Sequence, residues 1–205
     1  MGTASPAARA GLPPSHTLRE NSVMLKSPSS EEIRLDRRPG TARHSLMAGG
    51  IVIEEEKRIL GSIEAHGWYA VHRYDPELVE PNYTYSVGFS QTLDAPEFIV
   101  FGLHRDVMYD MLAGVYDKIK AGRKLEDNQV WKGLHEDFDC VARKVSHEDA
   151  FEKYAVLADW LWARNGQGGH PALVQIVWPG LLDGLYPWDE NCRDTVKAAQ
   201  PKLWR

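Results

Sequence analysis

The sequence predicts an α+β domain with an antiparallel or mixed sheet of about six strands and three packed helices, in the order αβββαββαβ. Two patterns carry this prediction. Apolar residues recur at helical spacing in three segments, and short apolar or alternating segments typical of strands occur in runs between them. Strands that come in runs argue against a doubly wound parallel sheet. A hydrophobic content of 43% is enough for a packed core.

The first half of the predicted domain holds one helix and three strands. A stripe that includes Ile59 and Ile63 predicts a helix over residues 51–66, which Gly67 ends. Strands are expected over 68–74, 83–89 and 97–103. The second alternates polar and apolar residues, so we expect it to be half-buried. The third is apolar on both faces, so we expect it at the centre of the sheet, in an antiparallel hairpin with the second.

The second half adds two helices and three strands. Apolar residues from Met108 to Ile119 predict a helix that Gly122 closes. Two strands, over 129–134 and 138–145, follow it. The pair Ser146 and Asp149 is typical of a helix start, and the helix behind it is expected to end at Asn165-Gly166. A last strand over 172–178 precedes a tail that contains several Pro and Gly residues.

Residues 1–46 are expected to form a disordered leader, and residues 47–205 a single domain. The leader contains no Trp, Tyr or Phe and has no periodic pattern, so it cannot bury enough apolar surface to offset the entropy of ordering. It has seven Lys and Arg against four Asp and Glu, whereas the remainder has 17 against 25. A regulatory tail, a targeting peptide and a mis-called start codon each fit this segment. We favour the mis-called start, because Met47 stands just before the first periodic helix.

Composition narrows the classes of function. A formal charge of -5 argues against a broad nucleic-acid-binding surface. The chain has no apolar run long enough to cross a membrane and no secretory signal. Its two cysteines, Cys140 and Cys192, form neither a CxxC pair nor a disulfide framework, which fits a reducing cytoplasm. We expect Cys140 to be a small strand residue and Cys192 to be exposed.

No complete catalytic, phosphate-binding or metal motif occurs in the sequence. His135-Glu136-Asp137 and His147-Glu148-Asp149 have residues of metal-ligand type, but adjacent side chains point in different directions, so we expect no metal site. The oligomeric state is left open by the sequence. The candidates for a ligand site are instead unusual local choices within apolar or aromatic segments: Tyr85, Gly88, Glu97, His104, Gln175, Trp178 and Trp188.

Each type of candidate has an alternative structural explanation. Gly88 and Gly102 interrupt strands, which marks a bulge or a close approach of ligand or backbone. Glu97 either caps backbone N–H groups of a loop or faces a pocket. Gln175 lies in an apolar strand, so its amide either ties down the adjoining tail or contacts a ligand. His104 could bind an anion, and the two tryptophans could form a stacking platform or a lid over the core.

Several blocks of the chain resemble an uncharacterised bacterial family, domain-of-unknown-function family 4262. They are His66-Gly67-Trp68, Tyr83-Thr84-Tyr85-Ser86-Val87-Gly88-Phe89, Pro96-Glu97-Phe98-Ile99-Val100-Phe101-Gly102-Leu103, Gln175-Ile176-Val177-Trp178-Pro179, Tyr186-Pro187-Trp188 and Gln200-Pro201-Lys202-Leu203. The resemblance runs from about Ile51 to Leu203 and implies no known activity. The family usually has Asp after the Trp-Pro pair, where this chain has Gly180, with Asp183 three residues further on.

Two functions from different classes remain open. The first is a small-ligand-binding module for a flavin- or nucleotide-like molecule. The aromatic strand followed by Pro96-Glu97 is similar to flavin-reductase-like split barrels, which implies a barrel-like sheet with flavin as the cofactor. The second is a non-catalytic protein-interaction factor, related to stress or immunity, with the aromatic tail as its binding face. Whether the chain is an enzyme is not decided by the sequence.

Overall fold

The computed structural model describes residues 51–77, 80–147 and 149–205. The predicted leader and the proposed start at Met47 lie outside these residues. The described chain begins with α2 (Ile51–His66) and β1 (Tyr69–Arg73). The other helices and strands follow in this order: β2 (Tyr83–Val87), α3 (Phe89–Thr92), β3 (Glu97–Phe101), α4 (Arg105–Lys120), β4 (Gln129–Trp131), β5 (Cys140–Lys144), α5 (Ala150–Lys153), α6 (Val156–Arg164), β6 (Leu173–Val177) and α7 (Asp194–Ala198).

The six strands form one mixed sheet in the order β1-β2-β3-β6-β5-β4. All neighbouring strands are antiparallel except β3 and β6, which run parallel with Glu97 opposite Leu173. The sheet is open, with β1 at one edge and β4 at the other, so the barrel-like alternative is wrong. The α+β class, the mixed sheet and the antiparallel pairing of β2 with β3 are confirmed.

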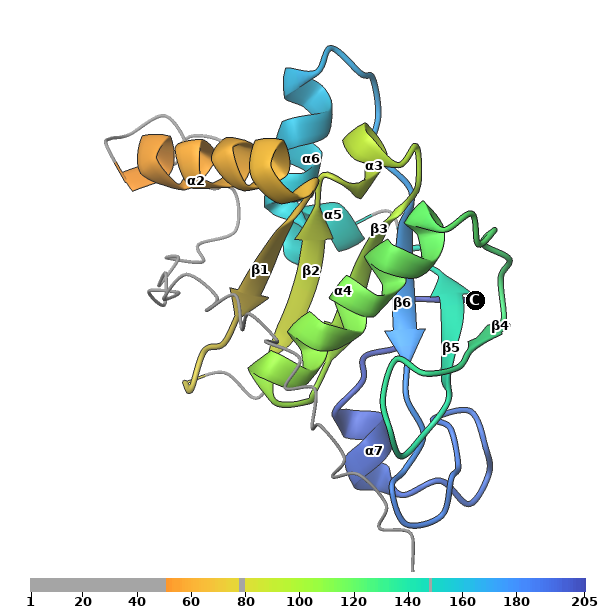
Figure 1. Ribbon diagram of the computed structural model, residues 1–205. Coiled ribbons are helices and arrows are strands. Elements are labelled where there is room, and N and C mark those ends of the chain that lie inside the picture. Colours follow the sequence, from red (N-terminus) through yellow and green to blue (C-terminus); the bar gives the residue numbers. More distant parts are fainter. Residues whose placement is uncertain (1–50, 78–79, 148) are drawn as a thin grey trace, which may run out of the picture. The chain divides into compact units, whose positions relative to one another are not determined.

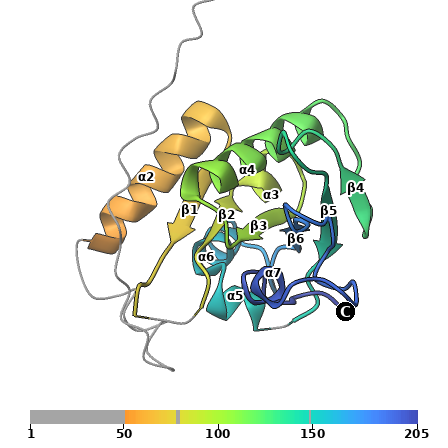
Figure 2. The ribbon, with the colours of Figure 1, turned by 90° about the horizontal axis from the view of Figure 1, so that it is seen from below.

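Helices cover both faces of the sheet (Figures 1 and 2). On one face α4 contributes Met108, Met111 and Leu112 to a core that contains Phe98 and Val100 of β3. On the other face α2, α5 and α6 pack against Ile99, Phe101 and the tyrosines of β2. Successive β3 side chains point to opposite faces and both faces are covered, so the strand is apolar on both sides from Phe98 to Phe101. Its central position is confirmed.

Strand β2 departs from the predicted half-buried strand. All five of its residues are buried, including Thr84 and Ser86. The alternation predicted which side chains share a face, and it was wrong about exposure because α4 covers the polar face. The hydroxyl groups find partners there: Thr84 contacts the His72 imidazole, and Ser86 accepts the backbone N–H of Phe98.

The third predicted helix is two helices, α5 and α6, separated at Tyr154 and Ala155. The predicted start at Ser146 is also wrong. Asp149 is the N-terminal cap residue, without a side-chain cap, and the Ser146 backbone N–H donates to Leu203 of the tail. The tail forms a further short helix, α7, which lacks a long apolar stripe. Tertiary contacts therefore fix this region, and they are not visible in local periodicity.

Candidate functional site

Glu97, at the start of β3, is a buried carboxylate surrounded by hydrogen-bond donors. Its Oε1 accepts the backbone N–H groups of Gly88 and Ser90, both at 3.0 Å, and the Ser90 hydroxyl at 2.8 Å. Its Oε2 accepts the Ser86 hydroxyl at 2.5 Å. Of the two roles that the sequence left open for Glu97, the structure shows the first: it caps the N–H groups of the turn that begins α3.

The environment of Glu97 acts on its pKa in two directions. Burial raises the pKa of this carboxyl, whereas the hydrogen bonds from Ser86, Ser90 and Gly88 oppose that rise. The groups that contact the carboxylate all donate to it, so its acceptor capacity is used inside the protein. Glu97 thus holds together the β2 end, α3 and the β3 start.

Gly88 allows this turn to form. Its φ of 111° lies in the left-handed region that favours glycine, and a Cβ placed there would lie 2.9 Å from Ile63 Cγ1 of α2. The group that closely approaches Gly88 is therefore a side chain of the protein itself, that of Ile63. Tyr85 on the same strand is also fully enclosed, with its hydroxyl 3.4 Å from the backbone N–H of Leu157.

Gln175, in the middle of β6, ties down the C-terminal tail. Its Nε2 donates to the Pro201 carbonyl at 2.9 Å, and its Oε1 accepts the Leu203 N–H at 3.3 Å. The amide is fully buried and has a donor and an acceptor in place. The structure thus shows the tail-tying role, one of the two alternatives that the sequence left open.

Trp178 continues this attachment. The Gln200 amide contacts the Trp178 backbone on both sides, accepting its N–H at 3.0 Å and donating to its carbonyl at 2.9 Å. The Trp178 indole donates to the Phe101 carbonyl at 2.8 Å. The ring is buried in the core, so it offers no free stacking surface. Gln200 was not singled out in the sequence, although a Gln beside Pro201 in an apolar tail is a weak signal.

Trp188 is the tryptophan candidate whose side chain is exposed. It is 41% exposed and stacks on Tyr186 at 4.9 Å, while Trp204 meets it edge-on at 5.7 Å. The Arg143 guanidinium lies over both indoles, 5.4 Å from Trp188 and 5.3 Å from Trp204, and donates to the Arg205 carbonyl. Arg143 was missed because an Arg near the end of a strand is usually read as solvated.

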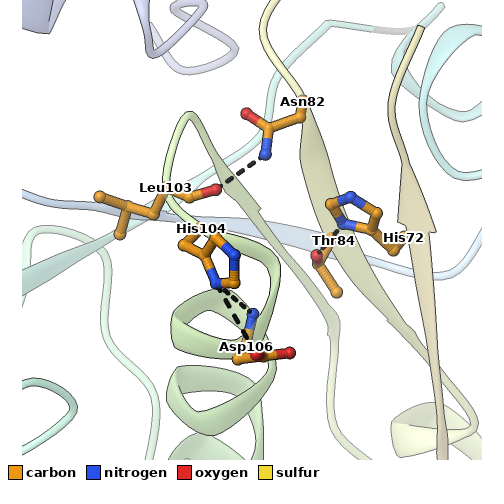
Figure 3. A network of polar contacts seen from close by, with 6 residues as sticks. All are labelled: His72, Asn82, Thr84, Leu103, His104 and Asp106. Atoms are coloured by element: carbon orange, nitrogen blue, oxygen red, sulfur yellow. Dashed lines mark hydrogen bonds and ion pairs between the residues drawn. The ribbon is translucent and has the colours of Figure 1, made fainter.

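His104 lies at the other end of β3 and caps α4 (Figure 3). Its Nδ1 accepts the Asp106 N–H at 3.4 Å, and its side chain is 77% exposed. Close by, Asn82 donates its amide N–H to the Leu103 carbonyl at 2.8 Å. The segment that follows β3 therefore forms the capped start of α4, and the His104 imidazole is exposed to solvent.

A second imidazole, His72 of β1, lies near His104 and bonds to the Thr84 hydroxyl at 2.9 Å (Figure 3). Burial, together with the nearby charges of Arg105, Arg73 and His104, lowers the pKa of His72 to about 4. This imidazole is consequently neutral at physiological pH. The two histidines lie far apart in the sequence, and the pairing of β1 with β2 and of β2 with β3 brings them close together.

The seven candidates do not gather around one cavity. Gly88 and Glu97 share the turn at the start of β3, whereas His104 follows the end of that strand. Gln175 and Trp178 bond to the C-terminal tail, and Tyr85 is enclosed by the core. Trp188 and His104 are the candidates with exposed side chains.

Two surface hollows are found elsewhere among the described residues. The larger, about 590 Å³, is formed by the open loop from Gly133 to Asp139, where His135 stacks on Phe138 at 4.1 Å. The smaller, about 180 Å³, is a crevice at the start of β6, lined by residues from β5, α5 and β6 and by Pro96, which precedes β3. Neither contains one of the seven candidates.

Neither cysteine is placed for nucleophilic chemistry. Burial raises the pKa of the Cys140 thiol to about 12, so the thiolate is scarce at neutral pH. Cys140 is a buried strand residue, as expected. Cys192 is buried too, which corrects the expected exposure, because its thiol points to the Leu185 carbonyl inside the folded tail. In the described part of the chain, no three metal-ligating residues converge, and no helix is long and apolar enough to span a membrane.

A feature that sequence reasoning missed is the loop from Gly180 to Leu185, here called the leucine loop. Leu181 is 67% exposed and Leu182 is 80% exposed. Backbone bonds from Gly180 to Leu185 and from Gly184 to Gly180, each 2.8 Å long, close the loop. Two adjacent leucines between Gly180 and Asp183 were a readable signal, since turns seldom need such side chains.

Asp183 completes this loop. Its Oδ1 accepts the Leu185 N–H at 3.1 Å, and its Oδ2 lies 3.2 Å from Arg193 Nε. A Cβ added to Gly180 would collide with Asp183 Oδ1. The carboxylate of Asp183 thus fills the space directly beside residue 180.

The chain belongs to the family described as domain of unknown function (DUF4262), which it matches over residues 62–193. The match runs from α2 to the residue before α7 and includes both the Glu97 turn and the leucine loop. The expected family is confirmed. No curated protein and no protein of solved structure matches the chain.

Proposed function

We propose that this member of the DUF4262 family is a protein-interaction module that docks through its leucine loop. The observation that supports this proposal is the exposure of two adjacent leucines, 67% for Leu181 and 80% for Leu182. Burial of a leucine side chain contributes about 1.5–3 kcal/mol. Burial of both side chains in a partner would therefore contribute a sizeable binding free energy.

The leucine loop is ordered by its own contacts before any partner binds. Two backbone bonds and the Asp183–Leu185 bond close it, and the Asp183–Arg193 ion pair attaches it to the segment before α7. Ordering an interface side chain or loop on binding costs free energy, and a loop that is already closed reduces that cost. This preorganisation supports a docking role for the exposed leucines.

The exposed side chains of the leucine loop indicate what kind of surface the partner presents. A pair of branched aliphatic side chains fits an apolar pocket on another protein. We therefore propose that the partner is a different protein with an apolar pocket on its surface. A second copy of this chain is an alternative outcome of the test.

The small-ligand function has less support. Glu97 and Gln175 use their polar atoms within the protein, and Tyr85 and Trp178 are buried. The crevice at the start of β6 has a volume of about 180 Å³, below the roughly 300–1,000 Å³ of pockets that hold drug-sized ligands. A flavin or nucleotide needs a site of that larger class.

We also infer a cytoplasmic location for the protein. Both cysteines are free and buried, and a chain without disulfides fits a reducing compartment. Fractionation of the native cells tests this inference.

The test of docking compares three tagged forms of the full chain in the native cells. These are the unchanged protein, the Leu181→Ser/Leu182→Ser double variant, and Tyr74→Ser, which removes another exposed apolar side chain. We expect one stoichiometric partner that the double variant loses and Tyr74→Ser keeps. With the purified partner, titration calorimetry should then give a dissociation constant at least about 100-fold weaker for the double variant.

Two outcomes would count against the proposal. Equal binding by the double variant would show that the leucines do not contact the partner. Self-association that the leucine substitutions abolish, measured by sedimentation, would assign the surface to a homodimer. The melting temperature of each variant should match that of the unchanged protein, because the side chains of Leu181, Leu182 and Tyr74 are all exposed.

A further inference from the structure

We propose that the crevice at the start of β6 binds a small organic anion, a carboxylate or phosphate on a compact apolar body. The crevice has a volume of about 180 Å³ and lies between the end of β5, the start of β6 and α5. It is separate from the leucine loop and does not depend on the docking function.

The walls of the crevice are mostly apolar. Phe151 of α5, Leu173 and Val174 of β6, and Pro96 and Pro171 contribute to them. Such a lining, with few polar groups, is typical of small-molecule sites, where the apolar part supplies affinity and the polar groups fix orientation.

The Phe151 wall is held in place from behind. Its ring stacks on the His170 imidazole, with centroids 5.1 Å apart and planes inclined by 6°. His170 Nδ1 in turn lies 2.5 Å from Asp159 Oδ1 of α6. An apolar wall fixed in this way loses little freedom when a ligand contacts it.

The polar lining of the crevice selects a negative ligand. Lys144 and His147 line it, and the described part of its lining contains no Asp or Glu. Among the residues that the structure describes, the Lys144 ammonium makes no ion pair, and its backbone N–H donates to Asp127. His147 lies close to Asp149, with Nδ1 and Oδ1 4.0 Å apart. Lys144 therefore offers a carboxylate or phosphate group a cationic partner at the crevice.

The volume limits the apolar part of the ligand. It is well below that of drug-sized sites, so a single ring or a short branched chain fits where a flavin or a nucleotide does not. Benzoate has a carboxylate on one ring, and benzamide has the same shape without the charge. These two compounds separate the contribution of charge from that of apolar contact.

The test is a titration of the isotope-labelled full chain with benzoate and with benzamide, followed by amide NMR shifts. We expect benzoate to shift the amides around Lys144, Phe151 and Leu173, with a dissociation constant on the order of 1–10 mM. Benzamide should bind at least about tenfold more weakly. Lys144→Gln should weaken benzoate about tenfold, whereas Lys124→Gln, a change at another exposed lysine, should not.

Three results would overturn the proposal: shifts outside the crevice only, equal affinity for the two compounds, or an unchanged affinity in Lys144→Gln. The Leu181→Ser/Leu182→Ser variant should bind benzoate normally. Failure of the docking function and failure of the anion site can thus be told apart.

Discussion

The carboxylate of Glu97 accepts the backbone N–H of Gly88 at 3.0 Å, across the turn that joins two antiparallel central strands. An ionised carboxylate without partners would be very unstable in such a buried place. Ser86 and Ser90 supply further donors, so the charge is compensated by oriented dipoles. Of the two roles left open for Glu97 by the sequence, a cap or a pocket residue, the structure therefore shows the cap.

Replacing Glu97 by Gln should destabilise the protein by about 2–3 kcal/mol. The amide keeps one acceptor oxygen but places an NH₂ group against the Ser86 hydroxyl, which already accepts from Phe98 N–H. The free energy of unfolding in urea measures the effect. The matched change Glu126→Gln, at an exposed acid, should alter it by less than about 0.5 kcal/mol. Equal stabilities for the two variants would contradict the role of Glu97 as a cap.

The fold was predictable where local pattern and tertiary environment agree. The stripe of α2, the buried run of β3 and the helix α4 follow directly from periodicity. The parallel pairing of β3 with β6 was not predictable, because it joins segments more than 70 residues apart whose patterns fit any central strand. The break between α5 and α6 was not predictable either. Apolar residues continue at helical spacing through Ala155, so the pattern indicates one helix.

The candidate site was predictable only in part. Polar residues in apolar strands correctly marked Glu97 and Gln175 as buried groups with specific partners. The sequence could not tell whether those partners belong to a ligand or to the chain, because Gly88 and Leu203 are brought to them by folding. Lys144 gave no signal, because its meaning depends on the apolar walls that α5, β6 and the residues Pro96 and Pro171 supply.

His72 should make the stability of the protein depend on pH. Its pKa is about 4 in the folded protein, against 6.5 for an unperturbed imidazole. Between these values the unfolded state binds more protons, so the free energy of unfolding should fall as the pH is lowered from 6.5 towards 4. In His72→Gln this part of the pH dependence should disappear. An NMR titration that gives His72 a pKa near 6.5 would contradict the expectation.

Gln175→Leu should loosen the C-terminal tail. The substitution leaves the Pro201 carbonyl and the Leu203 N–H without their side-chain partner, at a cost of about 2 kcal/mol. Hydrogen exchange at the Leu203 amide should become faster, while exchange in α4 should change only through the loss of global stability. Gln167→Leu, at an exposed glutamine, serves as the control. Unchanged exchange at Leu203 would show that other contacts hold the tail.

Two glycines separate backbone strain from a steric collision. Gly102 and Gly122 both have positive φ, 72° and 93°, so alanine at either should cost about 1–2 kcal/mol. A Cβ at Gly122 meets no atom within 4 Å, whereas at Gly102 it would collide with the Ala199 carbonyl after α7. Gly102→Ala should therefore lower the free energy of unfolding by at least about 1 kcal/mol more than Gly122→Ala. Equal losses would mean that the α7 segment can move away from β3 at little cost, and the tail would then be less firmly attached than its hydrogen bonds indicate.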